Sequence, residues 1–244
     1  MAERSDLEPR NRIGPERARS TRRDIEAFVS MAKAVAPRKE AGGGEPRGRL
    51  VFALDATMSR QPSWDAACDL QAELFRAADT AGGLAVQLAY YRGQGEARAS
   101  KWVEEAEALR RMMVRIECHG GLTQIGKILD HVAAEAAKSP VAAMAFVGDA
   151  MEEDIDRLCD KAGKLAMKGT RAFMFLEGRD PAAERAFREI ARLTRGVLLP
   201  FDRSAADELR ALLGAVATYA AGGRAALEAS GTASARRLLA DLGK

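Results

Sequence analysis

The sequence predicts an α/β fold, a doubly wound, mostly parallel sheet with helices on both faces and one short antiparallel edge strand. Short apolar runs alternate with longer stretches of helical periodicity through most of the chain. Gly- and Pro-containing stretches separate many of these segments. The run at 50–54 is apolar throughout, which is typical of a strand covered on both faces.

The expected elements follow this alternation along the chain. Strands are expected over the short apolar runs, at 50–54, 84–91, 97–103, 141–147, 171–176 and 196–201. Helices are expected over the periodic stretches, at 22–35, 64–78, 104–116, 124–138, 154–167, 181–194 and 205–220. Because strands and helices alternate, neighbouring strands should pair in parallel, and a ligand should bind at their carboxyl ends.

Composition divides the chain into three parts. Residues 1–47 are charged, with almost no large apolar residues before position 20, and form a flexible arm that carries the expected helix at 22–35 and a Gly/Pro-rich linker. Residues 48–221 form the main domain. Residues 222–244 form a short helical tail, interrupted at 230–232.

Overall composition excludes several classes of protein. The 244 residues are 47% hydrophobic, which is enough for a sizeable core. The net charge is only +3 although 30% of residues are charged, which argues against a dedicated nucleic-acid binder. No apolar run approaches the roughly 18 residues of a membrane span, and the N-terminus has no apolar signal region. Three cysteines without a C-x-x-C pair fit a reducing compartment. We therefore expect a cytoplasmic, bacterial-type protein.

Two carboxylates and three hydroxyls fall where the expected strands end or a helix begins. Asp55, Thr57 and Ser59 follow the first strand, and their alternate spacing puts them on one side of an extended turn. Thr123 follows a glycine pair just before a helix, and Asp149 closes the fourth strand. Oxygen atoms of this kind are the ligands of a small hard cation. The sequence therefore predicts a Mg²⁺ or Mn²⁺ site.

These three motifs resemble those of the von Willebrand factor A-type domain. Asp55-x-Thr57-x-Ser59 is similar to that family's Asp-x-Ser-x-Ser motif, and the later motifs are similar to its glycine-preceded threonine and its third-loop aspartate. Order and segment lengths match over about residues 48–221. Thr57 replaces the usual first serine, and one residue, Leu122, separates the glycine pair from the threonine.

The resemblance implies a metal-ion-dependent adhesion site. In that family the metal commonly binds a partner protein, whose acidic side chain completes the coordination. Intracellular relatives often serve as metal-binding subunits beside an ATPase, so an ATPase is one candidate partner. No nucleophile–base pair is visible in the sequence. We therefore expect a protein-binding module rather than an enzyme, with no catalytic residue and no organic cofactor.

Three alternatives stay open. Asp55 at a strand end, with a later Gly148-Asp149, also resembles haloacid-dehalogenase-type phosphotransferases, where the first aspartate is the nucleophile. That family's usual second aspartate is absent at the Thr57 position. The stretch 121–127 nearly spells a phosphate-binding loop but lacks the hydroxyl that should follow its lysine.

The remaining alternative is purely structural. Thr57 and Ser59 would satisfy a turn, while Thr123 and Asp149 would cap helices. The acidic run at 152–154 is expected to begin a helix, where negative charge is favourable; the alternative is that it extends the rim of the metal site.

Overall fold

The chain's structure, a computed structural model, describes residues 48–57, 71–202 and 206–242. All of them belong to one unit, Pro46–Lys244. The expected helix at 22–35, the linker after it, the first half of the helix at 64–78, and Ser59 lie outside the described residues. The boundaries of the arm and tail stay predictions.

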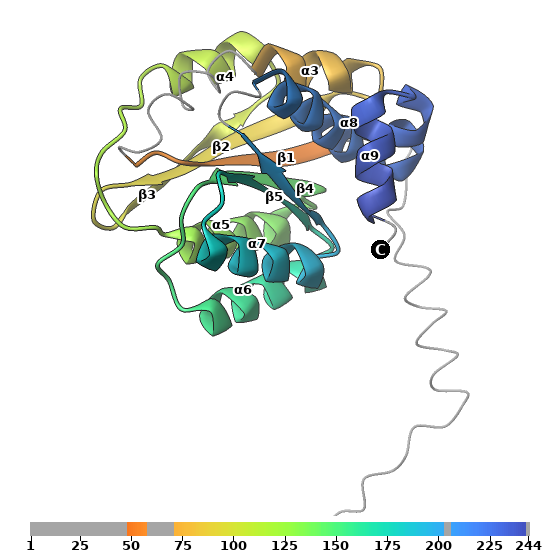
Figure 1. Cartoon of the computed structure of the whole chain (residues 1–244). Helices are drawn as coiled ribbons and strands as arrows, with labels where there is room; N and C mark the ends of the chain where they lie inside the picture. Colours follow the sequence, from red (N-terminus) through yellow and green to blue (C-terminus); the bar gives the residue numbers. More distant parts are fainter. Residues whose placement is uncertain (1–47, 58–70, 203–205, 243–244) are drawn as a thin grey trace, which may run out of the picture. The chain divides into compact units, whose positions relative to one another are not determined.

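The described elements follow the alternation expected from the sequence (Figure 1). The strands are β1 (Gly48–Asp55), β2 (Leu84–Arg92), β3 (Glu96–Val103), β4 (Ala143–Gly148), β5 (Arg171–Glu177) and β6 (Val197–Phe201). The helices are α3 (Gln71–Asp79), α4 (Ala106–Met113), α5 (Ile125–Lys138), α6 (Ile155–Met167), α7 (Pro181–Leu193), α8 (Ala206–Ser230) and α9 (Ala233–Leu242).

The strands form one sheet in the order β3-β2-β1-β4-β5-β6. Every neighbouring pair is parallel except β2 and β3, which are antiparallel, so the expected fold class is confirmed. From β1 the chain builds the sheet outward in one direction through β2 and β3, and then in the other through β4, β5 and β6. The boundary between β1 and β4 is therefore the place where the strand order reverses, and ligands bind such sheets outside the carboxyl ends at this place.

Each face of the sheet packs against its own helices (Figure 1). In β1, Leu50, Phe52 and Leu54 belong to the core shared with α3, α4, α8 and α9. Val51 and Ala53 point the other way, into the core under α5, α6 and α7. All five side chains are at most 2% exposed, which confirms that β1 is covered on both faces and explains its continuous apolar run.

The C-terminal residues pack on the first of these cores. Gly223 has non-helical backbone angles (φ 70°, ψ −160°) and kinks α8 there. A break at 231–232 separates α8 from α9, as expected. Leu227 and Leu238 are completely buried in the same cluster as β1. In the described ranges, no helix combines the length and apolarity needed to cross a membrane.

Candidate metal centre

The two predicted carboxylates meet because of the strand order. Asp55 is the last residue of β1, and Asp149 directly follows β4. These strands are hydrogen-bonded neighbours that run in parallel. Their carboxyl ends therefore lie side by side, at the point where the strand order reverses.

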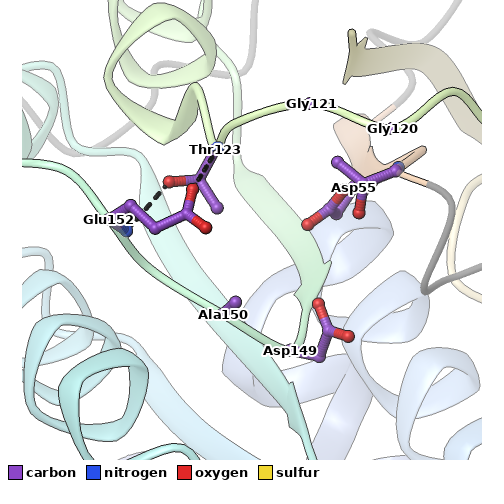
Figure 2. Close-up of a pocket in the computed structure, with 8 residues that line it drawn as sticks. Asp55, Gly120, Gly121, Thr123, Asp149, Ala150 and Glu152 are labelled. Carbon is purple, nitrogen blue, oxygen red and sulfur yellow. Dashed lines mark hydrogen bonds between the residues drawn. The ribbon is translucent and has the colours of Figure 1, made fainter.

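A cavity of about 220 Å³ opens between these strand ends (Figure 2). Its described lining comprises Asp55, Thr57, Gly120, Gly121, Thr123, Asp149, Ala150 and Glu152. Four of the five predicted ligands are in this set, and the fifth, Ser59, lies outside the described residues. Three of the described lining residues are acidic and none is basic, so the cavity favours a cation.

Hydrogen bonds from Thr57 and Tyr91 orient Asp55. Its side chain is almost completely buried, and its Oδ1 accepts the backbone N–H of Thr57 (2.8 Å). Its Oδ2 accepts the hydroxyl of Tyr91 (3.0 Å). Burial raises the pKa of Asp55, the hydrogen bonds from Thr57 and Tyr91 oppose that rise, and the negative charge of Asp149 adds to it. An ionised Asp55 is therefore held in place but lacks a compensating positive charge among the described lining residues.

Asp149 faces the same space as Asp55 in Figure 2. Its Oδ1 is buried and has no hydrogen-bond partner among the described residues. A buried carboxylate oxygen without a partner is costly. Asp149 does not cap the next helix, because Asp154 does so by accepting the N–H of Arg157 (3.0 Å). The helix-cap alternative for Asp149 is thus wrong, and its free oxygen fits a cation.

Thr123 forms a reciprocal pair with Glu152 (Figure 2). The N–H of Thr123 donates to the Glu152 carboxylate (2.9 Å), and the N–H of Glu152 donates to the Thr123 hydroxyl (3.1 Å). The N-cap of α5 is Gln124, so the helix-cap alternative for Thr123 is also wrong. The Thr123 hydroxyl is used as an acceptor and is turned toward Glu152, away from Asp55.

Glu152 and Glu153 do not begin a helix, which corrects the sequence prediction. Helix α6 starts after them, at Ile155. Glu153 instead accepts the N–H groups of Ile125 and Gly126 (3.0 Å for Gly126) at the start of α5. The negative charge does lie at a helix N-terminus, but the helix is α5 rather than α6. Two consecutive glutamates therefore connect the β4–α6 loop to the loop at 114–124, here called the Thr123 loop, and to the start of α5.

Close backbone contacts hold the Thr123 loop against the end of β2. A Cβ atom on Gly121 would come within 2.0 Å of the Gly93 carbonyl oxygen, so only glycine fits. The N–H of His119 donates to the carbonyl of Ala56 (3.0 Å). These contacts place the glycine pair between the β1 end and the β2–β3 turn.

The near-match to a phosphate-binding loop receives no support from the structure. The ammonium group of Lys127 donates to the Gly95 carbonyl (2.7 Å) and to the side chain of Gln124 (2.9 Å). It is therefore engaged by the β2–β3 turn, and it is not among the residues that line the cavity.

The donor set fits a hard cation only if hydroxyls take part. No three His, Cys, Asp or Glu side chains in the described ranges are grouped so as to hold a metal ion by themselves. Asp55 and Asp149 would therefore be the anionic ligands and Thr57 a neutral oxygen ligand, while the Thr123 hydroxyl would join them through a shift of its loop away from Glu152. This composition matches Mg²⁺, which takes one or two carboxylates and keeps several waters.

Sequence reasoning missed Tyr91 and did not anticipate the pairing of Glu152 with Thr123. Tyr91 lies opposite Asp55 in the parallel pairing of β1 and β2. Burial and the neighbouring Asp55 raise the pKa of Tyr91 well above its usual range, which keeps the phenol a hydrogen-bond donor. Its position at the end of a strand that neighbours β1 is the one signal that could have pointed to it.

Comparison with solved structures identifies the fold. The chain superimposes on a von Willebrand factor type A protein from Catenulispora acidiphila with a TM-score of 0.56 and 17% identity, over 71% of this chain and 43% of that one. The SpRpn10 VWA domain matches with a TM-score of 0.55 and 11% identity, over 67% of this chain and 95% of that one. This chain has the von Willebrand factor A-type fold.

A third match extends the range of proteins that share the A-type fold. The ArnB paralog VWA2 from Sulfolobus acidocaldarius gives a TM-score of 0.50 and 14% identity, over 71% of this chain and 46% of that one. No protein-family model matches the sequence, and no curated protein matches it either. At these identities the likeness concerns the fold alone.

Proposed function

We propose that this chain is a divalent-cation-dependent protein-binding module. Asp55 and Asp149 would hold Mg²⁺ or Mn²⁺ together with the hydroxyls of Thr57, Ser59 and Thr123. An acidic side chain of a partner protein would complete the coordination. The bound cation supplies the positive charge that lets an acidic cavity recruit an acidic partner.

The observation that carries this proposal is the unpaired buried oxygen of Asp149 beside a buried Asp55. Two carboxylates share one cavity, and none of its described lining residues is basic. A folded protein rarely leaves such a pair uncompensated, because each buried charge needs a counter-charge or hydrogen bonds. A cation removes the cost for both carboxylates.

The phosphotransferase alternative has weaker support. A phosphate would need a cationic partner, and the described lining residues include no lysine or arginine. This observation favours binding over catalysis. We keep a protein partner, with an ATPase as one candidate, and a cytoplasmic location as parts of the proposal.

The first test is thermal unfolding of the full chain with and without Mg²⁺ or Mn²⁺. Ligand at 100 times its dissociation constant should raise the free energy of unfolding by about 2.7 kcal/mol. For a chain of this size that corresponds to a rise in Tm of roughly 5–10 °C. Asp55→Ala should abolish the gain, because it removes one of the two anionic ligands.

The matched control is Asp207→Ala. Asp207 is an exposed aspartate in the first turn of α8, bonded to Arg210, and its loss should leave the metal-dependent gain unchanged. A melting curve that does not respond to millimolar metal would contradict the metal site. Partner capture that survives both chelator and Asp55→Ala would contradict metal-bridged binding. Hydrolysis of a phosphoester that depends on Asp55 would favour the phosphotransferase instead.

A further inference from the structure

Among the described residues, Tyr91 is the one side chain that donates a hydrogen bond to a predicted anionic ligand without itself lining the cavity. Its hydroxyl donates to Oδ2 of Asp55 over 3.0 Å, and its side chain is completely buried. The two residues come from neighbouring parallel strands and face each other in register. The register of β1 and β2 therefore fixes the contact between Tyr91 and Asp55.

Contacts with other aromatic rings restrict the position of the Tyr91 ring and so of its hydroxyl. It stacks on Phe146 of β4, with the ring centroids 6.2 Å apart and the planes 23° apart. Phe146 in turn packs edge-on against Phe187 of α7 at 5.3 Å. The Tyr91 backbone carbonyl also accepts the N–H of Ala56, the residue after Asp55 (2.9 Å). Side chain and backbone of Tyr91 thus both fix the end of β1.

We propose that Tyr91 is a positioning residue for the metal site, which sets the orientation of the Asp55 carboxylate that the cation requires. This inference rests on the proposed function. A carboxylate that binds a metal must present its oxygens at a fixed angle, and outer hydrogen bonds supply that constraint. Thr57 N–H and Tyr91 O–H hold one oxygen each from two sides.

A merely structural role for Tyr91 makes a different prediction. If the hydroxyl served only to satisfy a buried oxygen, its loss would lower stability and leave metal affinity alone. If it orients Asp55 for the cation, its loss weakens metal binding. Loss of an outer hydrogen bond of this kind typically lowers metal affinity by 10–100-fold.

The test is Mn²⁺ binding to the full chain, measured by water proton relaxation, for wild type and Tyr91→Phe. The Phe variant removes only the hydroxyl and should bind Mn²⁺ about 10–100-fold more weakly. Tyr90→Phe is the matched control, because Tyr90 is the next residue of β2 and packs against the opposite core. The Mn²⁺ affinity of the Tyr90→Phe variant should equal that of wild type.

Two outcomes of this binding measurement overturn the inference, and they can be told apart. Equal Mn²⁺ affinity for wild type and Tyr91→Phe would show that the hydroxyl does not orient the site, while the proposed function survives. Absence of Mn²⁺ binding to wild type at millimolar metal would remove the proposed function, and this inference with it.

A second measurement covers the case in which Tyr91→Phe does not fold. The chain has three tyrosines, so 3-fluorotyrosine labelling of the otherwise unchanged chain gives three ¹⁹F resonances. Tyr90→Phe and Tyr219→Phe assign the resonance of Tyr91 by elimination. Saturating Mg²⁺ should shift the Tyr91 resonance and leave the other two in place. An unmoved Tyr91 resonance in a chain whose Tm rises with Mg²⁺ would overturn the inference.

Discussion

Two carboxylates of this chain are nearly buried but differ in their surroundings. One belongs to Asp55, at the end of β1, and the other to Glu135, on the sheet-facing side of α5. The exposed fraction is 2% for Asp55 and 8% for Glu135. Their neighbours differ. Asp55 faces another carboxylate, Asp149, and its pKa is raised, mainly by burial. Hydrogen bonds, first from Lys138 and then from Trp102, lower the pKa of Glu135.

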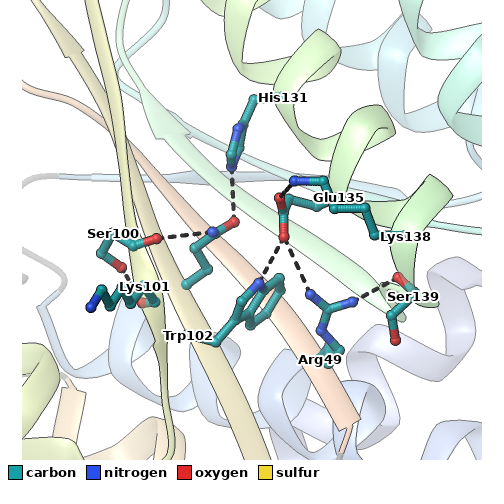
Figure 3. Close-up of polar contacts among 9 residues, drawn as sticks. Arg49, Ser100, Lys101, Trp102, His131, Glu135, Lys138 and Ser139 are labelled. Carbon is teal, nitrogen blue, oxygen red and sulfur yellow. Dashed lines mark hydrogen bonds and ion pairs between the residues drawn. The ribbon is translucent and has the colours of Figure 1, made fainter.

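Each carboxylate oxygen of Glu135 has a hydrogen-bond donor (Figure 3). Its Oε1 accepts the ammonium of Lys138 (2.7 Å), and its Oε2 accepts the indole N–H of Trp102 (2.8 Å) and pairs with Arg49 (3.3 Å). The Arg49 guanidinium also lies 3.8 Å from the centre of the Trp102 ring and donates to the carbonyl of Ser139 (2.7 Å). This Glu135 cluster joins β1, β3 and α5.

The two carboxylates differ in how the fold compensates their charge. In the Glu135 cluster each carboxylate oxygen has a donor, and the one negative charge is paired with two cations, Lys138 and Arg49. At the Asp55 cavity an oxygen of Asp149 has no partner among the described residues, and two negative charges face each other. The fold itself completes the Glu135 cluster, whereas at the Asp55 cavity this role falls to the cation that we propose.

The largest change in stability that tests this difference is expected for Glu135→Ala in the presence of chelator. The change leaves the charge of Arg49 and the N–H of Trp102 without their acceptor. The free energy of unfolding should fall by about 3 kcal/mol, as measured by denaturant titration. Asp149→Asn should change it by less than about 1 kcal/mol, because its Oδ1 accepts no hydrogen bond from the described residues. Equal losses for the two variants would contradict the distinction.

A smaller change in stability tests the close approach of Gly121 to Gly93 beside the cavity. Gly121→Ala should lower the free energy of unfolding by about 2 kcal/mol, because the new Cβ would collide with the backbone of Gly93. It should also reduce the metal-dependent rise in Tm, since the Thr123 loop must move. Gly120→Ala is the control: a Cβ there meets nothing within 4 Å among its neighbours. Indistinguishable Tm values and metal responses for the two variants would rule out the close approach.

The smallest effect concerns His131, which lies one turn before Glu135 on α5. Its Nε2 is 2.8 Å from Oε1 of Gln87, whose amide donates to the carbonyl of Ser100 (2.9 Å; Figure 3). Burial lowers the pKa of His131, with Glu135 opposing the shift and Lys138 adding to it. The folded chain therefore takes up this proton less readily than the unfolded chain.

The stability that His131 contributes is thus present above about pH 6.5 and is lost as the pH falls toward the lowered folded pKa. Denaturant titrations between pH 7 and 5 should show a steeper loss for wild type than for His131→Gln. The difference in slope should stay well below the roughly 1.4 kcal/mol per pH unit that one full proton gives. Parallel pH profiles for the two chains would show that His131 does not cause the loss of stability at low pH.

Much of the site's location followed from the sequence. The apolar run ending at Asp55 predicted a strand covered on both faces, and the residues before Asp149 predicted a second strand. Both aspartates come at carboxyl ends, and parallel strands put these ends at one edge of the sheet. The cavity between β1 and β4 contains both.

Contacts across the fold were not predictable in the same way. Glu152 and Glu153 read locally as the start of a helix, yet they bond to Thr123 and to the start of α5. Gly121 is required by its approach to Gly93, which lies on a different loop. The packing of α5 against β2 brings His131 to Gln87, a contact that the sequence does not indicate.

By itself, then, the sequence determined the α/β alternation, the burial of β1 and the edge of the sheet where two aspartates must meet, because these depend on local periodicity and on the direction of parallel strands. The tertiary structure alone decided which carboxylates are neutralised and which are left facing each other. That outcome depends on which side chains from separate segments reach the same few ångströms, and strand register and close packing set those distances.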